Sequence, residues 1–345
     1  MKLSFAPYLL KFKRPFSIAH GSRDSTPVIF TRLDHEGVVG YGEASMPPYL
    51  GETHETALSF LSKAVNVLDK FRGDDNIAMI LEEVDRMAHG NTAAKASIDI
   101  ALHDLIGKIQ NRSCHEMFGA DRTKPVFTAY TIPMDEPEGI RTRVEEAQEY
   151  SILKVKMGSS DDKKLIEEIR KHTSKNIMVD ANEGWKDKQA ALEMVEWLSH
   201  RNVQMVEQPM PKEQVDDTAW LCERSAIPII ADEAVKRLSD IEKAKGIYTG
   251  INIKLMKSTG LHEAHKMIVQ ARKYGMKIMI GCMSETSCGV SAAAQLAPLA
   301  DWIDLDGPLL IKEDYFSGVK FSAGKILLND LAGIGVIPLK TLTGF

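Results

Sequence analysis

The chain is poor in cysteine and has no long apolar run. Only four of its 345 residues are cysteines, and none of them forms a Cys-x-x-Cys pair. A chain of this length needs no disulfide framework, so we expect reduced thiols and a cytoplasmic protein. No stretch approaches the roughly 20 apolar residues of a membrane-spanning helix, and the N-terminal segment lacks the apolar centre of a signal peptide. The sequence therefore predicts no membrane partner.

Strong positive charge and glycine-rich phosphate loops are also missing. The net charge of −5, without a basic patch, argues against a nucleic-acid partner. No glycine-rich fingerprint follows a predicted strand, which argues against a dinucleotide or P-loop site. No cluster of histidine and cysteine has the spacing of a zinc site. The sequence leaves the oligomeric state open, and a homo-oligomer is compatible with it.

The first 122 residues contain strand-like runs followed by helical ones. Strands are predicted at 2–10, 28–33 and 38–43, with a hairpin turn at 34–37. Helices are predicted at 53–71, 77–87 and 92–109 from the spacing of their apolar residues. Strands followed by helices are typical of an α+β unit, so we expect an N-terminal α+β capping domain over residues 1–122.

Residues 123–310 alternate between short apolar runs and helical segments. Eight strands are predicted, at 126–132, 152–157, 177–180, 203–206, 227–231, 251–255, 277–281 and 302–305. Eight strand–helix repeats favour the α/β class and a modified, TIM-like (β/α)8 barrel. We expect the C-terminal segment, residues 311–345, to pack back on the capping domain.

Five successive strands of this predicted barrel end in charged residues. Neighbouring charges are separated by 22 to 27 residues, which is about one strand, one helix and their loops. They are Lys154 and Lys156, then Asp180, Glu207, Asp232 and Lys254. A barrel brings the carboxyl ends of its strands to one mouth, so these side chains are predicted to share one pocket.

The three acids predict a metal site. Asp180, Glu207 and Asp232 follow consecutive strands, and their oxygen atoms are the ligands that Mg²⁺ prefers. The alternative is that each acid caps the helix that follows it.

The three lysines predict acid/base chemistry. Lys154 and Lys156 flank Val155, so both point to the barrel interior, and Lys254 would approach from the opposite side. Repulsion between the amines and from a metal ion should lower their pKa values towards neutrality, as a general base requires. Amines on both faces of one carbon could remove and return a proton through an enediolate. Alternatively, the lysines only form salt bridges to the acids.

The order of these motifs resembles the enolase superfamily. The motifs are Lys-x-Lys (154–156), Asp-x-Asn (180–182), Glu-Gln-Pro (207–209), Ala-Asp-Glu (231–233) and Asn-x-Lys (252–254). The lysine on the sixth strand resembles the muconate-lactonizing-enzyme subgroup. This resemblance implies that Asp180, Glu207 and Asp232 bind Mg²⁺, supported by Asn182 and Glu233. It also implies that Lys156 and Lys254 are the acid/base pair and that Lys154 assists the substrate carboxylate.

The last predicted strand carries an Asp-x-Asp motif. Asp304 and Asp306 share one face of this strand, unless they only cap a turn. The motif resembles the dipeptide epimerases, in which such a pair holds the α-ammonium group of a dipeptide. The resemblance implies epimerisation at the α-carbon of the C-terminal residue, with L-Ala-D/L-Glu, a fragment from peptidoglycan recycling, as the expected substrate.

Side-chain specificity is predicted to come from loops at the barrel mouth. The expected loops are residues 19–26 and 46–52. Arg23 is the candidate partner for a glutamate side chain because arginine binds carboxylates in bidentate fashion, unless it is only a surface residue. Ser284 is expected in the pocket wall.

Two other hypotheses about function use most of the same residues. An o-succinylbenzoate synthase or an N-acyl amino acid racemase would keep the lysines and the acids, but their substrates offer no ammonium group for Asp304 and Asp306. A non-catalytic, metal-dependent binder on the same barrel is the alternative from another class.

Overall fold

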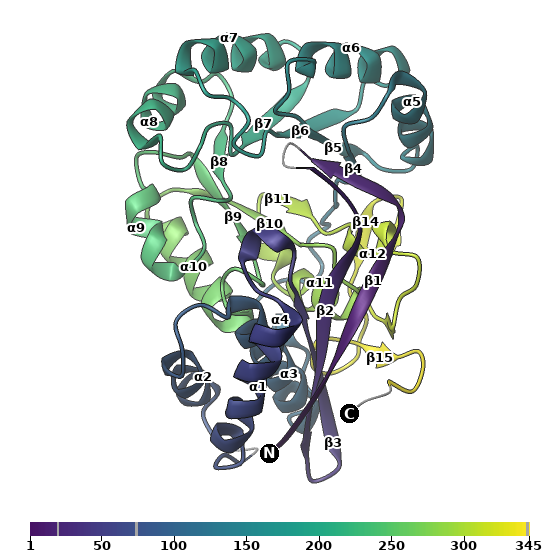
Figure 1. The fold of residues 1–345 in the computed structure, drawn as a ribbon, viewed down its shortest axis with the longest axis vertical. Helices are drawn as coiled ribbons and strands as arrows, with labels where there is room; N and C mark the ends of the chain where they lie inside the picture. The colour runs from purple at the N-terminus through teal and green to yellow at the C-terminus, as the bar shows by residue number, and fades with distance from the viewer. Residues whose placement is uncertain (19–20, 73–74, 343–344) are drawn as a thin grey trace.

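A computed structural model of the chain describes residues 1–18, 21–72, 75–342 and 345 (Figure 1). The chain begins with an antiparallel sheet of three strands in the order β1 (Lys2–Ile18), β2 (Gly21–His35) and β3 (Val38–Ser45). Glu36 and Gly37 close the β2–β3 hairpin with φ angles of 52° and 82°. This left-handed backbone favours glycine and is typical of a two-residue hairpin, so the predicted turn is confirmed.

The first two strands are longer than the sequence pattern predicted. Residues 21–26, which we expected in a mouth loop, belong to β2, while residues 19–20 of that loop lie outside the described residues. The pairing of β1 with β2 shifts register between Lys11 and Phe16. Polar residues on both faces and this irregularity interrupt the alternation from which strands are recognised.

Helices α1 (His54–Leu68) and α3 (Thr92–Ile109) lie against this sheet, and α2 (Ile77–Arg86) packs against both helices. They match the predicted helices to within a few residues at each end. Helix α3 is buried along most of its length and lies against β3. A Cβ atom at Gly42 would lie 1.9 Å from the backbone oxygen of Ser97, so the close approach of strand and helix requires glycine there.

Eight parallel strands form the predicted barrel. Neighbours in the sheet are consecutive in the chain, and the parallel bridge between Thr128 and Ile303 joins the two ends. The strands are β4 (Tyr130–Ile132), β5 (Ile152–Lys156), β6 (Asn176–Asp180), β7 (Val203–Glu207), β8 (Ile229–Ala231), β9 (Gly250–Lys254), β10 (Lys277–Gly281) and β11 (Trp302–Asp304). The first strand starts at Tyr130 and not at Val126, because Phe127 and Thr128 form only isolated bridges.

Helices surround the barrel on its outer side (Figure 1). They are α5 (Pro137–Glu146), α6 (Asp162–His172), α7 (Lys188–Ser199), α8 (Val215–Arg224), α9 (Ile241–Ala244), α10 (Leu261–Lys273), α11 (Ser287–Ala294) and α12 (Gly307–Leu310). The short helix α4 (Cys114–Met117) precedes the barrel, and 3₁₀ turns lie at Pro48–Leu50, Leu238–Asp240 and Ala297–Leu299. No helix in the described parts of the chain is long and apolar enough to span a membrane.

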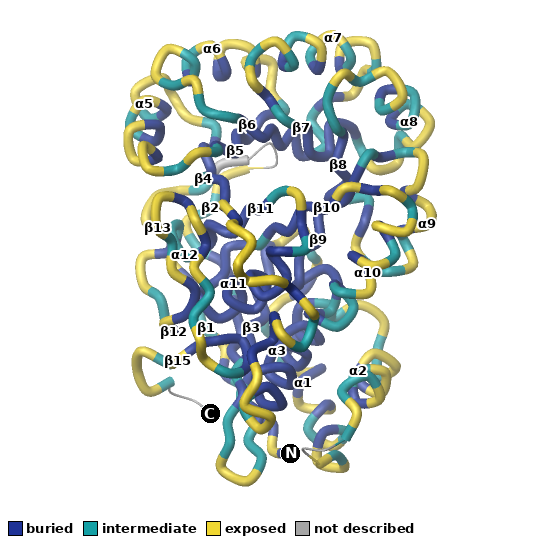
Figure 2. The backbone as a smooth tube through the Cα atoms, turned by 180° about the vertical axis from the view of Figure 1, so that it is seen from behind, coloured by how far each residue is buried: buried dark blue, intermediate teal, exposed yellow. Residues whose placement is uncertain are grey.

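An apolar layer fills the barrel interior next to the predicted site. Met178, Met205 and Ile230 are fully buried and belong to a small apolar cluster separate from the main core. Side chains two residues apart on a strand share a face. The acids at 180, 207 and 232 therefore project into the barrel directly above this cluster (Figure 2 shows how deeply these strands are buried).

The C-terminal segment lies against the N-terminal sheet. It contains the short strand pairs β12 (Phe316–Ser317) with β15 (Ile337–Pro338), and β13 (Lys320–Ser322) with β14 (Lys325–Leu327). The ring of Phe316 lies 5.3 Å from that of Phe30, and Ile334 donates its N–H to Asp104 Oδ1 over 3.0 Å. The C-terminal segment thus packs against β2 and α3 of the N-terminal part.

Candidate active site

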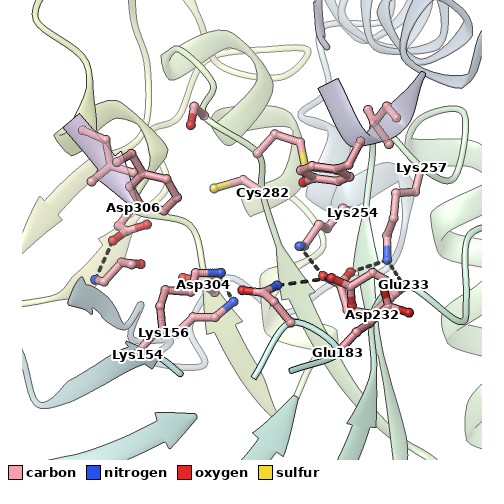
Figure 3. Close-up of a pocket in the computed structure, with 18 of the residues that line it drawn as sticks. Lys154, Lys156, Glu183, Asp232, Glu233, Lys254, Lys257, Cys282, Asp304 and Asp306 are labelled. Atoms are coloured by element: carbon pink, nitrogen blue, oxygen red, sulfur yellow. Dashed lines mark hydrogen bonds and ion pairs between the residues drawn. The ribbon is translucent and has the colours of Figure 1, made fainter. Parts of the chain in front are cut away.

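A cavity of about 150 Å³ lies at the carboxyl ends of the barrel strands (Figure 3). The barrel supplies most of its wall, and β1, β2 and the 48–50 turn supply the remainder. The cavity is lined by ten predicted site residues: Arg23, Lys154, Lys156, Asn182, Asp232, Glu233, Lys254, Ser284, Asp304 and Asp306. Asp180 and Glu207 are fully buried just behind it. The structure thus brings all twelve predicted residues to one place.

The three predicted metal ligands converge. One carboxylate oxygen each from Asp180, Glu207 and Asp232 lies within 4.8 Å of the others, and all three side chains are buried. The helix-cap alternative is wrong, because the N-cap residues of the following helices α7, α8 and α9 are Asp187, Gln214 and Asp240. Three buried carboxylates at this separation can hold one hard cation.

Neighbouring polar groups orient these carboxylates. Asn252 donates from Nδ2 to Glu207 Oε1 over 2.6 Å. The backbone N–H of Asn182 donates to Asp180 Oδ1 over 3.1 Å, and its side chain donates to Glu233 Oε1 over 3.2 Å. Burial and the adjacent Asp232 raise the pKa of Glu233 to about 8. Asn182 and Glu233 therefore lie in contact with the acidic cluster, as expected.

Each predicted lysine contacts an acid of the cluster. Lys156 Nζ donates to Asp180 Oδ2 and Lys254 Nζ donates to Asp232 Oδ2, both over 2.6 Å. Strands β5 and β9 are four positions apart in an eight-stranded barrel, which places them across its axis. Figure 3 accordingly shows Lys156 and Lys254 entering the cavity from different sides.

The predicted lowering of the lysine pKa values is wrong for Lys154 and Lys254. Burial alone would lower both values, but the acids around each amine raise them well above the usual range. Lys154 Nζ lies 2.6 Å from Asp304 Oδ2 and 2.7 Å from Glu207 Oε2. The lower values were predicted from repulsion between the amines and from a metal ion, whereas the folded chain places each amine against a carboxylate.

The Asp-x-Asp pair faces the cavity beside Lys154. Asp304 Oδ2 is paired with the Lys154 amine, but the buried Oδ1 has no hydrogen-bond partner among the described residues. Asp306 accepts the backbone N–H of Thr131 over 2.7 Å, and its side chain does not cap α12. Burial and the nearby Asp304 raise the pKa of Asp306 to about 7. Two neighbouring buried carboxyl groups, of which only one is paired with an amine, can accept a further cation.

The two predicted mouth residues also reach the cavity. Burial lowers the pKa of Arg23, and its Nη1 atom is buried without a hydrogen-bond partner in the described part of the chain. Its guanidinium carbon lies 5.8 Å from the centre of the Phe12 ring. Ser284 is buried beside β10, and its backbone oxygen accepts the hydroxyl of Ser45 over 2.8 Å.

Sequence reasoning missed Lys257. Its buried amine donates to the side chain and backbone of Asp232 and to the backbone oxygens of Val235 and Asn252. Burial lowers its pKa, while the contact with Asp232 opposes this effect. Lys257 lies in the turn that follows β9, where the two-residue alternation no longer predicts direction. The available signal was a lysine that directly follows the apolar residues Leu255 and Met256 near the end of a barrel strand.

Family comparisons agree with this geometry. Residues 6–119 match the family model of the mandelate racemase / muconate lactonizing enzyme N-terminal domain, and residues 139–340 match the enolase C-terminal domain-like model. The chain belongs to the enolase superfamily. The resemblance read from the motifs is thereby confirmed.

Individual relatives with similar sequences or structures include dipeptide epimerases. The chain is 50% identical to the L-Ala-D/L-Glu epimerase of Bacteroides thetaiotaomicron, over 98% of this chain and 88% of that protein. The substrate-liganded L-Ala-D/L-Glu epimerase from Bacillus subtilis superposes with a TM-score of 0.91 at 27% identity, covering 98% and 99% of the two chains. A dipeptide epimerase from Cytophaga hutchinsonii, complexed with Mg and D-Ala-L-Val, gives 0.89 at 27% identity, covering 99% and 97%.

Proposed function

We propose that this chain is an isomerase that epimerises a dipeptide at the α-carbon of its C-terminal residue, with Mg²⁺ as cofactor. L-Ala-D/L-Glu is the proposed substrate. The observation that carries the proposal is the buried pair Asp304 and Asp306, which lies in the same cavity as lysines from opposite sides of the barrel. The pair suits a free ammonium group, which a dipeptide has and an N-acyl amino acid lacks.

The acidic cluster fits the proposed metal ion. Asp180, Glu207 and Asp232 would hold it, since each offers a carboxylate oxygen and these oxygens lie within 4.8 Å of one another. When bound, the ion supplies positive charge next to the substrate carboxylate, which stabilises charge that develops there. The similar structure from Cytophaga hutchinsonii, which contains Mg and a dipeptide, supports this assignment.

The lysines would perform the proton transfers. Lys156 removes the proton from one face of the α-carbon, and Lys254 donates a proton to the other face, or the reverse for the opposite epimer. Both amines are held on carboxylates in the structure, so the acting base must leave its partner and lose its proton. Lys154 stays charged and donates to the substrate carboxylate, in keeping with its raised pKa.

Arg23 would select the side chain of the C-terminal residue. A buried guanidinium nitrogen without a partner is costly, and a glutamate carboxylate would satisfy it. This makes the proposed substrate a dipeptide with a neutral N-terminal and an acidic C-terminal residue.

The cellular context belongs to the same proposal. Four free cysteine thiols support a cytoplasmic location, and L-Ala-D/L-Glu would reach the enzyme from peptidoglycan recycling. We also propose that residues 1–122 form the capping domain, residues 123–310 form the barrel, and residues 311–345 form a segment that packs back on the capping domain.

A panel of dipeptides in deuterium oxide with Mg²⁺ tests the function. We expect deuterium at the α-carbon of the C-terminal residue, measured by mass, with L-Ala-L-Glu exchanged fastest. Exchange of N-succinyl amino acids without exchange of any dipeptide would support the N-acyl racemase instead. Turnover of neither class, with retained metal binding, would support a non-catalytic binder.

A further inference from the structure

Two hydrogen-bond donors at the cavity are incompletely used. The first is Arg23, whose Nη1 has no hydrogen-bond partner among the described residues. The second is Tyr49, which lies in the 48–50 turn and donates its hydroxyl to Met283 Sδ over 2.6 Å. A thioether sulfur is a weak acceptor. A carboxylate close to both groups would therefore form stronger hydrogen bonds than either donor has now.

Both donors lie near the proposed reaction centre. Tyr49, Arg23 and Lys254 line the same cavity. Burial raises the pKa of the Tyr49 hydroxyl, the charges of Asp232 and Glu233 raise it further, and those of Lys254 and Arg23 oppose this effect. Tyr49 is 49% exposed as a whole, so its ring forms part of the rim while its hydroxyl points inward to Met283. The hydroxyl is thus a neutral donor near both cationic groups.

We propose that Tyr49 and Arg23 together bind the side-chain carboxylate of the C-terminal residue, and that Tyr49 is a specificity-determining residue. This inference rests on the proposed dipeptide epimerase function. The hydroxyl exchanges Met283 for a carboxylate oxygen, so binding gives up only a weak contact. Tyr49 takes no part in proton transfer, and its effect is limited to substrates with an acceptor on that side chain.

The rest of the local structure holds Tyr49 in place. Pro47 precedes the turn, Pro48 begins it, and Gly51 closes it with a left-handed φ of 75°. Met283 lies two residues after the end of β10, so the Tyr49–Met283 contact connects the 48–50 turn to the barrel wall. A donor fixed in this way loses little conformational entropy on binding.

The variant Tyr49→Phe tests the proposal, because it keeps the ring and removes only the hydroxyl. We expect kcat/KM for L-Ala-L-Glu to fall by about 10- to 100-fold, the range for a hydrogen bond to a charged group. L-Ala-L-Met, which has a similar length and no carboxylate, should react as it does with the unchanged protein. Tyr274→Phe is the matched control, because Tyr274 ends α10 and stacks with Lys245 at 4.7 Å, away from the cavity lining.

Other outcomes overturn the proposal. Equal losses with both dipeptides would mean that Tyr49 only closes the cavity, and unchanged selectivity would mean that its hydroxyl is not used. Calorimetry that measures the binding of the same dipeptides in the presence of Mg²⁺ distinguishes failure of the Tyr49 proposal from failure of the proposed epimerase function. Weaker binding of L-Ala-L-Glu alone by the variant, without α-proton exchange in the unchanged protein, would retain the binding role and reject the epimerase.

Discussion

In the proposed mechanism, Lys156 and Lys254 act on opposite faces of one carbon, so their loss should affect the two epimers differently. We expect Lys156→Ala and Lys254→Ala each to reduce epimerisation by about 10²- to 10⁴-fold, the usual contribution of a general base. In deuterium oxide each variant should still exchange the α-proton of the one epimer that its remaining lysine can reach. Exposed Lys163 on α6, replaced by Ala, is the control. Retained epimerisation in either active-site variant would contradict the two-base mechanism.

Asp306 should contribute to binding at a cost in stability. Its burial next to Asp304 raises its pKa to about 7, so its ionised form is disfavoured in the folded chain. Asp306→Asn keeps an acceptor for the Thr131 N–H and removes the charge. We expect kcat/KM for dipeptides to fall by about 10- to 100-fold and the melting temperature at pH 8 to stay equal or rise. A lower melting temperature with unchanged kinetics would show that the residue is structural.

The site residues differ in how well the sequence predicts them. Asp180, Glu207 and Asp232 were predictable because each ends an apolar run, and parallel barrel strands deliver their ends to one mouth. The lysine pKa values were not predictable, since the direction of each pKa shift depends on which atoms lie within about 3 Å of the amine. Lys257 and Tyr49 lie in turns, where spacing along the chain does not fix the direction of a side chain.

At the scale of secondary-structure elements, buried segments were the predictable ones. Helix α3 and the barrel strands have apolar patterns that match their burial, and apart from the late start of β4 their bounds agree closely with the expectation. The outer parts of β1 and β2 carry polar residues on both faces, so their strands were predicted too short. Their length follows from pairing with each other near the barrel mouth and not from a local pattern.

The contact between β3 and the loop before α11 contains two buried carboxyl groups. Glu43 accepts the N–H of Thr286 over 2.9 Å and that of Gly289 over 3.0 Å. Glu285 Oε1 accepts the N–H of Met283, while its buried Oε2 has no partner among the described residues. A Cβ atom at Gly289 would lie 2.3 Å from Glu285 Oε2 and 3.3 Å from Glu43 Oε2, so the two groups meet above this glycine.

This carboxyl pair should make stability depend on pH. Burial raises the pKa of Glu43 to about 7 and that of Glu285 to about 8. The folded chain therefore holds protons that the unfolded chain loses near pH 4.5, and the free energy of unfolding should fall between about pH 5 and pH 8. Glu285→Gln should reduce this fall in urea unfolding, whereas exposed Glu149→Gln should not. If the free energy of unfolding fell equally with pH in the unchanged protein and in Glu285→Gln, burial of Glu285 would not be the cause of the pH dependence.

At the scale of the whole molecule, the barrel was predictable from the number of alternating strands and helices. The same number also predicted that the sheet closes. Eight strand–helix repeats predict a closed sheet, and the hydrogen bond from the N–H of Ala129 to the oxygen of Ile303, 3.0 Å long, joins the first and last strands. The packing of the C-terminal segment on the first sheet depends on contacts such as Phe316 with Phe30, which are distant in sequence. No local pattern encodes such contacts.

Closure also means that metal binding should stabilise the molecule as one unit. The three acids lie on consecutive strands β6 to β8, and unfolding the barrel separates them, so an ion binds the folded chain alone. Saturation at 100 times Kd should add about 2.7 kcal/mol and raise the melting temperature measurably. Asp180→Asn should abolish the rise on adding Mg²⁺, whereas Asp216→Asn, an exposed change on α8, should preserve it. An equal rise in both variants would mean that the stabilising ion binds elsewhere on the chain.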